Sequence, residues 1–203
     1  QLVTAYADLL RDHVDEEGEQ FLDAVHESAD HAVELTETAR ETAAVMLAQT
    51  DDPDRRNLRA ALEAEVEEVE TTYPDAEVTL DRPVPSVVVR ANDMLGSVFR
   101  NLLKNAIQHN DESTPRVEVS AVDRGETVVV RVADNGPGVP ESQREDIFGE
   151  GQKGLDSHGA GMGLYLVRTL VEGYGGEVRV ADAEPKGATF VVELPTVGSD
   201  AVP

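Results

Sequence analysis

Two runs of alternating apolar residues near the middle of the chain constrain its fold most strongly. The runs "RVEVSAV" (116–122) and "TVVVRVA" (127–133) are rich in β-branched residues, and the polar turn "DRGE" separates them. This arrangement predicts an antiparallel hairpin. The stretch "EVRVADAEPKGATFVVELP" (177–195) predicts a second, closing hairpin, and "EVTLD" (77–81) and "VPSVVVRA" (84–91) predict two shorter strands.

Helical patterns lie between these strands without a regular strand–helix–strand alternation. Residues 58–70 carry apolar side chains on one face, and Asn92 is a suitable N-cap for a helix over 93–109. The stretch "GLYLVRTLVEGYGG" (163–176) predicts a helix that glycines end. This order of elements favours an α+β fold, a two-layer α/β sandwich in which helices cover one face of a mixed sheet.

The first 50 residues have a different pattern, which predicts an antiparallel helical hairpin. Small and apolar residues recur in steps of three and four, as in a packed helical seam, at Leu22, Val25, Ala29, Ala32, Thr36, Ala39, Ala43 and Met46. The segment "DHVDEEGEQ" (12–20) is expected to be the loop of the hairpin, and "TDDPDRRN" (50–57) a polar linker. We expect the seam to be buried in a four-helix bundle of two chains, or alternatively against the rest of the same chain.

Charge and composition exclude several classes of function. Acidic residues outnumber basic ones by 41 to 17, and the formal net charge is −24. Such a chain repels nucleic acids and anionic membranes, so neither is an expected partner. The charge fits either a protein adapted to high salt or an ordinary acidic cytoplasmic protein. There are no cysteines, which excludes disulfides and thiolate metal sites, and no apolar run approaches the roughly 20 residues that span a bilayer.

Polar residues form one stripe on the predicted helix over 93–109. Asn101, Asn105 and His109 are spaced by four residues and therefore share a face. Asparagine offers a neutral oxygen that suits a hydrated Mg²⁺ ion. The alternative is that the stripe is simply a solvated helix face.

Two glycine-rich stretches are the other candidates for a ligand site. In "DNGPGVP" (134–140), Asp134 ends a strand and could accept a hydrogen bond from an exocyclic amino group. Gly136 and Gly138 leave room for a flat ring against the backbone. The alternative is that the stretch is a plain turn. In "SHGAGMGLYLVRTL" (157–170), three alternating glycines lead into a helix, whose first backbone N–H groups bind anions well. The spacing fits neither a dinucleotide-binding turn nor a P-loop.

Taken in order, these stretches resemble the sequence boxes of sensor histidine kinases. "NLLKNAIQHN", "DNGPGVP", "IFGEGQKG", "GAGMGL" and "GATF" are similar to the N, G1, F, G2 and G3 boxes of that family. The resemblance implies a catalytic ATP-binding domain over residues 57–197 and, over 1–50, a truncated dimerisation and histidine-phosphotransfer hairpin.

The resemblance also implies roles for individual residues. Asp134 would read the adenine amino group, Asn105 would ligate Mg²⁺, and Asn101 would lie along the phosphates. Residues 149–160 would form a lid over ATP. The remaining expected ATP-binding residues are His109 near the phosphates or ribose, Gly136 and Gly138 in the pocket floor, Phe148 of the F box, Lys153 of the lid, the phosphate cradle Gly159, Gly161, Gly163 and Leu164, and Thr189 near the adenine.

Two departures refine the expected function. Hydrolytic relatives of this ATP fold carry a glutamate where Asn101 stands, which favours phosphoryl transfer over ATP hydrolysis. The phosphoacceptor histidine box is absent, because His13, His26 and His31 lack its context, so the acceptor is expected upstream of Gln1. The predicted function is transfer of the γ-phosphoryl group of Mg-ATP to that histidine.

The resemblance further implies a homodimer formed through the hairpin, a response regulator receiver domain as partner, and a cytoplasmic location. One alternative is a regulatory ATP-binding module, of a pseudokinase or phosphatase type, without kinase activity. A serine-phosphorylating relative that controls sigma factors is another, which the long helical hairpin disfavours.

Overall fold

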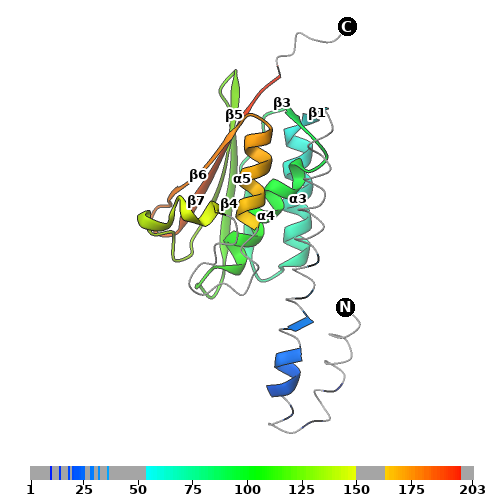
Figure 1. Cartoon of the computed structure of the whole chain (residues 1–203), viewed down its shortest axis with the longest axis vertical. Helices are drawn as coiled ribbons and strands as arrows, with labels where there is room; N and C mark the ends of the chain where they lie inside the picture. The colour runs from blue at the N-terminus through cyan, green and yellow to red at the C-terminus, as the bar shows by residue number, and fades with distance from the viewer. Residues whose placement is uncertain are drawn as a thin grey trace.

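The computed structural model describes residues 54–149 and 163–197, together with 10, 14, 18, 20–25, 28, 29, 32 and 36. Three helices lie on one side of a five-stranded sheet (Figure 1). The helices are α3 (Leu58–Thr72), α4 (Leu95–Gln108) and α5 (Gly163–Gly173). The strands, in the order in which they lie in the sheet, are β2 (Glu77–Leu80), β4 (Arg116–Asp123), β5 (Thr127–Asp134), β7 (Ala188–Pro195) and β6 (Glu177–Asp182).

The sheet is mixed, as expected for an α/β sandwich of this class. Strand β2 runs parallel to β4, and the pairs β4–β5, β5–β7 and β6–β7 are antiparallel. Both predicted hairpins are therefore confirmed. Two short 3₁₀ helices, η1 (Glu141–Gln143) and η2 (Asp146–Phe148), follow β5.

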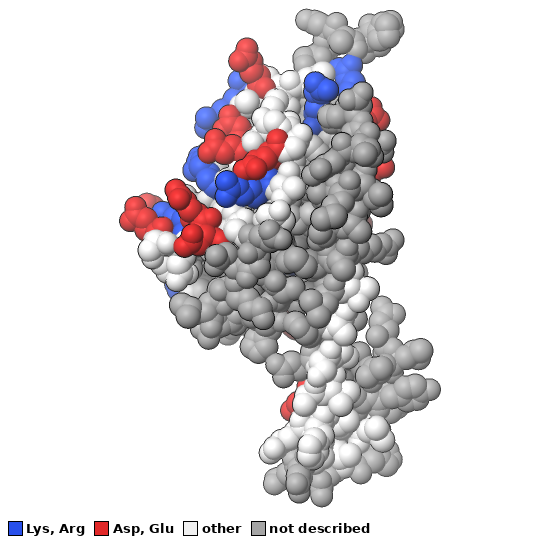
Figure 2. Space-filling model, viewed as in Figure 1, with Lys and Arg blue, Asp and Glu red and all other residues white. Residues whose placement is uncertain are grey.

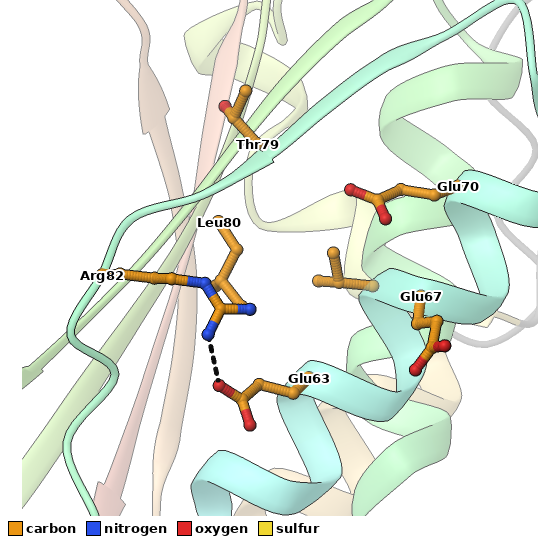
Figure 3. A pocket seen from close by; sticks show the side chains of 7 residues that line it. Glu63, Glu67, Glu70, Thr79, Leu80 and Arg82 are labelled. Carbon is orange, nitrogen blue, oxygen red and sulfur yellow. Dashed lines mark hydrogen bonds and ion pairs between the residues drawn. The ribbon is translucent and has the colours of Figure 1, made fainter.

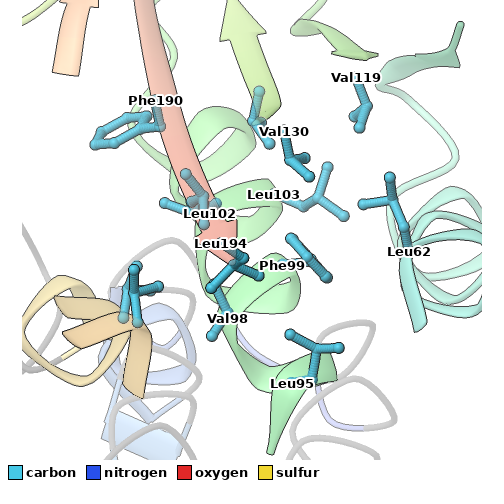
Figure 4. Packing of buried hydrophobic residues seen from close by; sticks show 14 of the residues in the cluster. Leu62, Leu95, Val98, Phe99, Leu102, Leu103, Val119, Val130, Phe190 and Leu194 are labelled. Carbon is cyan, nitrogen blue, oxygen red and sulfur yellow. The ribbon is translucent and has the colours of Figure 1, made fainter. Parts of the chain in front are cut away.

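Helix α4 forms the centre of the core. Its apolar face points at the sheet, where Phe99, Leu102 and Leu103 are fully buried (Figure 4). Val130 of β5 and Leu194 of β7 meet it from the sheet side. Because every second residue of these strands faces α4, the alternation in the sequence becomes one continuous apolar layer.

A buried ion pair fixes α3 against α4. Glu65 is only 8% exposed, and its carboxylate accepts two hydrogen bonds from the Arg100 guanidinium, at 2.9 and 3.1 Å. Gly96, one turn earlier on α4, leaves the space that this carboxylate occupies, since a Cβ there would overlap Glu65 Oε1. A bidentate pair of this kind fixes the register of two helices, because removing one partner would leave a buried charge unpaired.

The structure corrects the expected linker. The last four residues of "TDDPDRRN" form strand β1 (Asp54–Asn57), which pairs antiparallel with β3 (Val88–Ala91). Asn57 then serves as the N-cap of α3, because its side chain accepts a hydrogen bond from the Ala60 N–H at 3.1 Å. A polar sequence can form an edge strand when a partner strand supplies its hydrogen bonds.

The start of α4 also differs from the prediction. The helix begins at Leu95, and Asn92 lies before it rather than at the N-cap position. The Asn92 side chain accepts hydrogen bonds from the Met94 N–H and from the Tyr174 hydroxyl, so it joins the start of α4 to the end of α5.

Most of the predicted N-terminal hairpin lies outside the described residues. Residues 20–25 are helical, as are Ser28, Ala29, Ala32 and Thr36. Gly18 and Gln20 are helical too, so the expected loop over 12–20 does not extend to its predicted end. The two-domain division and the seam as a dimer interface remain predictions. Among the described residues, no helix is both long and apolar enough to cross a bilayer.

Candidate functional site

The Asp134 carboxylate lies where β5 ends, and two backbone N–H groups hold it. Its Oδ1 accepts hydrogen bonds from Gly136 N at 2.9 Å and from Ala188 N at 3.1 Å. The first donor is local, in the turn that follows the strand. The second comes from β7, which the antiparallel β5–β7 ladder brings alongside. Because both donors meet Oδ1, the carboxylate orientation is fixed.

The other oxygen of Asp134, Oδ2, accepts no hydrogen bond from a protein donor within the described residues. Burial raises the pKa of the Asp134 carboxyl above its usual range, and the hydrogen bonds from Ala188 and Gly136 offset part of that rise. An ionised carboxylate oxygen of this kind can accept a hydrogen bond from a ligand N–H group.

Three glycines lie close together around Asp134, where the backbone leaves little space for a side chain. Gly187 has a φ of +117°, and a Cβ there would overlap the Asp134 carbonyl oxygen. Gly138 has a φ of +77°, and its Cβ would lie 3.0 Å from the Gly187 carbonyl oxygen. A Cβ on Gly136 would lie 3.0 Å from Asp134 Oδ1. The glycines of "DNGPGVP" thus have a tertiary role in addition to forming a turn.

Two asparagines complete these surroundings, and the sequence analysis missed both. Asn110 Nδ2 donates to Asn135 Oδ1 at 2.9 Å, and Asn135 Oδ1 also accepts from the Arg116 N–H at 2.8 Å. These bonds hold the loop between α4 and β4 against the turn after Asp134. The only signal in the sequence was the turn-forming character of "HND" and "DNG".

The polar stripe of α4 runs toward the start of α5. Asn101 is half-buried, and its Nδ2 donates to the Ser97 carbonyl at 2.8 Å. Its Oδ1 lies so close to Gly163, the first residue of α5, that a Cβ there would approach it to 2.7 Å. Asn105 lies one turn further along α4 and is also half-buried, whereas His109 is exposed at the C-cap. The structure therefore brings Asn101 to the α5 N-terminus, where backbone N–H groups favour an anion.

Phe148 is a packing residue in this structure. It is 5% exposed and meets Phe190 of β7 edge to face, with ring centroids 6.3 Å apart. Nearby, Arg144 donates to the Val139 carbonyl at 3.2 Å and to Asp182 of β6. These contacts anchor the chain just before residue 150. Residues 150–160 of the expected lid, which include Lys153 and Gly159, and Gly161 of the expected phosphate cradle lie outside the described residues.

The β5–β7 register places Thr189 on the other face of the sheet from Asp134. Thr189 is opposite Ala133, so both side chains point away from the helices. Ala188, which is 3% exposed, instead stands beside the Asp134 carboxylate. Of these two residues, it is therefore Ala188 that contacts Asp134, and a role for Thr189 near the adenine stays a prediction. Leu164 is half-buried in the first turn of α5, next to Gly163.

A separate groove lies between α3 and β2, and it is poorly suited to a nucleotide. Its volume is about 610 Å³, and glutamates of α3 line it together with Thr79, Leu80 and Arg82 (Figure 3). Glu63 pairs with Arg82 at 3.0 Å, but Glu67 and Glu70 add two further carboxylates. These charges would repel phosphates.

The described surface shows no broad basic patch in the view of Figure 2, where acidic and basic side chains alternate. Within the described residues, no group of three or more His, Cys, Asp or Glu side chains could hold a metal ion.

Comparison with known proteins decides the family. The family described as "Histidine kinase-, DNA gyrase B-, and HSP90-like ATPase" matches residues 91–198, which include Asp134 and the whole of α4 and β7. The chain belongs to this ATPase family. The match supports ATP binding, and it covers every described residue of the site.

The related proteins are sensor histidine kinases. Sensor histidine kinase DpiB of Escherichia coli (strain K12) is 40% identical over 106 residues, which are 50% of this chain and 19% of that protein. Adaptive-response sensory kinase SasA of Prochlorococcus marinus (strain MIT 9303) is 28% identical over 185 residues, which are 87% of this chain and 50% of that kinase. The chain thus spans half or less of the length of these relatives.

Solved structures agree with this assignment. The ATP-binding domain of PrrB from Mycobacterium tuberculosis has a TM-score of 0.62 at 27% identity, covering 73% of this chain and all of that one. Full-length ShkA in complex with AMPPNP has a TM-score of 0.68 at 25% identity, covering 97% of this chain and 43% of that one. The chain therefore contains a histidine kinase-type ATP-binding domain.

Proposed function

We propose that this chain is the catalytic core of a two-component sensor kinase, which transfers the γ-phosphoryl group of Mg-ATP to a protein histidine. The observation that carries the proposal is the Asp134 carboxylate, whose Oδ1 is held by two backbone donors, while Oδ2 has no donor among the described residues. In the proposal, Oδ2 accepts from an amino group of the base. Adenine presents such a donor, and guanine presents a carbonyl at the same position.

The other residues of the site have complementary roles in this proposal. The start of α5 binds the phosphates, because helix N–H groups donate to anionic oxygens. Asn101 lies beside this helix start, with its Oδ1 close to Gly163. Asn105 contributes a neutral oxygen to Mg²⁺, which fits a hydrated cation held mainly by the nucleotide. When bound, Mg²⁺ neutralises charge on the phosphates. The protein's contribution is to position the nucleotide and to exclude water from the base.

Asparagine at position 101 is consistent with transfer rather than hydrolysis. A carboxamide cannot take a proton from water at neutral pH, whereas a carboxylate could act as a general base. Its Nδ2 is also engaged with the Ser97 carbonyl. The attacking group is therefore expected to come from a protein acceptor and not from a water molecule that Asn101 activates.

We also propose that the N-terminal helix meets a second copy of the chain. Phe21 is 68% exposed and Val25 is 40% exposed, and the two side chains are one turn apart on the same helix. Exposed apolar pairs of this kind gain free energy when a partner helix covers them. A receiver domain of a response regulator is the proposed downstream partner.

The test is phosphoryl transfer in trans. The chain is mixed with γ-labelled ATP, Mg²⁺ and the phosphoacceptor helical region of one of its full-length relatives, and the label is traced by its acid-labile, base-stable bond. We expect label on histidine from the wild-type chain, far less from Asn105→Ala, and an unchanged amount from Asp123→Asn, whose carboxylate lies in the hairpin turn. Binding of ADP without any transfer to several acceptors would instead assign a regulatory ATP-binding module.

A further inference from the structure

An ion pair joins two loops that are far apart in the sequence. Lys186, in the turn between β6 and β7, donates from Nζ to Glu112 Oε1 at 2.7 Å. The same ammonium donates to both Asp111 oxygens, at 3.1 and 3.3 Å. Asp111 and Glu112 belong to the loop between α4 and β4. We call Lys186, Asp111 and Glu112 the Lys186 clasp.

Each of the two loops also touches the surroundings of Asp134. In the β6–β7 turn, the two residues that follow Lys186 make these contacts. Gly187 packs on the Asp134 carbonyl, and the Ala188 N–H donates to Asp134 Oδ1 at 3.1 Å. Lys186 is thus connected to Asp134 through the backbone of Gly187 and Ala188.

On the other side, Asn110 directly precedes Asp111. A Cβ on Gly136 would lie 3.5 Å from the Asn110 Cα, and Asn110 Nδ2 donates to Asn135 Oδ1 at 2.9 Å. The Asn110 Oδ1 also accepts from the Glu112 N–H at 3.0 Å, which orients the loop. The contacts therefore form a closed ring around Asp134, and the Lys186 clasp completes it.

We propose that Lys186 is a positioning residue for the adenine-reading carboxylate. This inference rests on the proposed function, because it assigns to the clasp the task of holding the Ala188 N–H against Asp134 Oδ1. Lys186 lies in a turn that a backbone hydrogen bond closes, from the Ala183 N–H to the Gly187 carbonyl at 3.1 Å, and the clasp adds a restraint from a distant loop. With the clasp open, Ala188 would move more freely, and Oδ2 would be presented to the base in a less defined direction.

The main competing view is that the clasp is an ordinary surface ion pair with little effect. Two observations favour a larger role. The ammonium engages three carboxylate oxygens from two residues, and the hydrogen bonds that it donates to Glu112 and to Asp111 raise the pKa of Lys186. The pair also connects segments 74 and 75 residues apart, so it restrains loops that the local sequence leaves independent.

The test compares Lys186→Met with the control variant Arg82→Met. The control removes an exposed cation from a different ion pair, the one between Arg82 and Glu63 of α3. Adenosine is the probe, because it has no charge and does not respond to the lost cation through long-range repulsion. We expect adenosine and ADP to bind about threefold more weakly to Lys186→Met at low salt, within the range of exposed ion-pair networks. Arg82→Met should bind both as wild type does.

Two further readouts separate positioning from general destabilisation. The Ala188 amide should exchange with solvent faster in Lys186→Met, while amides of β4 keep their protection. The double variant Lys186→Glu with Glu112→Lys should restore adenosine affinity, and molar KCl should abolish the difference between Lys186→Met and wild type.

The inference is overturned if Lys186→Met binds adenosine as tightly as wild type, or if Arg82→Met weakens binding equally. Failure of the proposed function gives a different result, in which Asp134→Asn leaves adenosine affinity unchanged. The two failures are therefore distinguishable.

Discussion

Replacing Asp134 by asparagine should reverse the base preference of the site. Gly136 N and Ala188 N both donate to Oδ1, at 2.9 and 3.1 Å, so the asparagine must place its carbonyl oxygen there. Its NH₂ group is then forced into the position of Oδ2. A donor would face the adenine amino group, which is also a donor, whereas a base with a carbonyl at this position would gain a hydrogen bond.

The size of the effect follows from the bonds involved. Losing a hydrogen bond to a charged acceptor costs about 1.5–3 kcal/mol, and desolvating two opposed donors adds about 1 kcal/mol. The sum is roughly 3 kcal/mol, so ADP affinity should fall about 100-fold. Inosine diphosphate carries a carbonyl in place of the adenine amino group, and we expect it to bind about tenfold more tightly to the variant than to wild type.

Titration calorimetry with ADP and inosine diphosphate measures both changes. Asp123→Asn is the matched control, because Asp123 Oδ1 accepts from the Gly125 N–H at 2.8 Å in a similar turn, but at the far end of the hairpin. Its affinities should equal those of wild type. If Asp134→Asn binds ADP as well as wild type does, or if the preference for ADP over inosine diphosphate is unchanged, Asp134 does not read the base.

The same carboxyl group links binding to pH. Since burial raises its pKa in the folded protein, protonation of Asp134 favours the folded state. Its contribution to stability is therefore full below the unfolded pKa of about 4 and is lost as the pH rises through the folded value. Adenine binding has the opposite dependence, because only the ionised form accepts a hydrogen bond at both oxygens. ADP affinity should weaken on acidification at a higher pH than an ordinary aspartate would give, and Asp134→Asn should remove that step.

Two further predictions concern stability. Gly187→Ala should lower the free energy of unfolding by about 3 kcal/mol or more in urea titrations, because the new Cβ overlaps the Asp134 carbonyl at φ +117°. The control Gly125→Ala, at φ +88° with open space around it, should lower it by only about 1 kcal/mol. Equal losses would show that the close packing at Gly187 is unimportant. Raising KCl from about 0.1 M to about 2 M should raise the melting temperature, since a net charge of −24 is then screened, and a flat or falling melting temperature would argue against adaptation to high salt.

Local patterns in the sequence determined the fold class and the identity of the central carboxylate. The alternation in "RVEVSAV" and "TVVVRVA" was sufficient for the β4–β5 hairpin, because one strand face must be apolar to cover α4. The ordered boxes from "NLLKNAIQHN" to "GATF" pointed to an ATP-binding domain, and the family match confirms it. Asp134 was a candidate because it ends a strand and two glycines follow it, and the resemblance to the G1 box gave it its expected role.

Only the tertiary structure decided which residues surround that carboxylate. The side of the sheet on which Ala188 and Thr189 stand depends on the β5–β7 register, which non-local hydrogen bonds set. The strand at Asp54–Asn57 exists because β3 pairs with it, although its own sequence is polar. Asn110 and Lys186 each look like ordinary loop residues in the sequence, and they meet the surroundings of Asp134 only after α4, β5 and β7 have packed together. Packing brings residues from distant segments to one carboxylate, and no local pattern encodes that proximity.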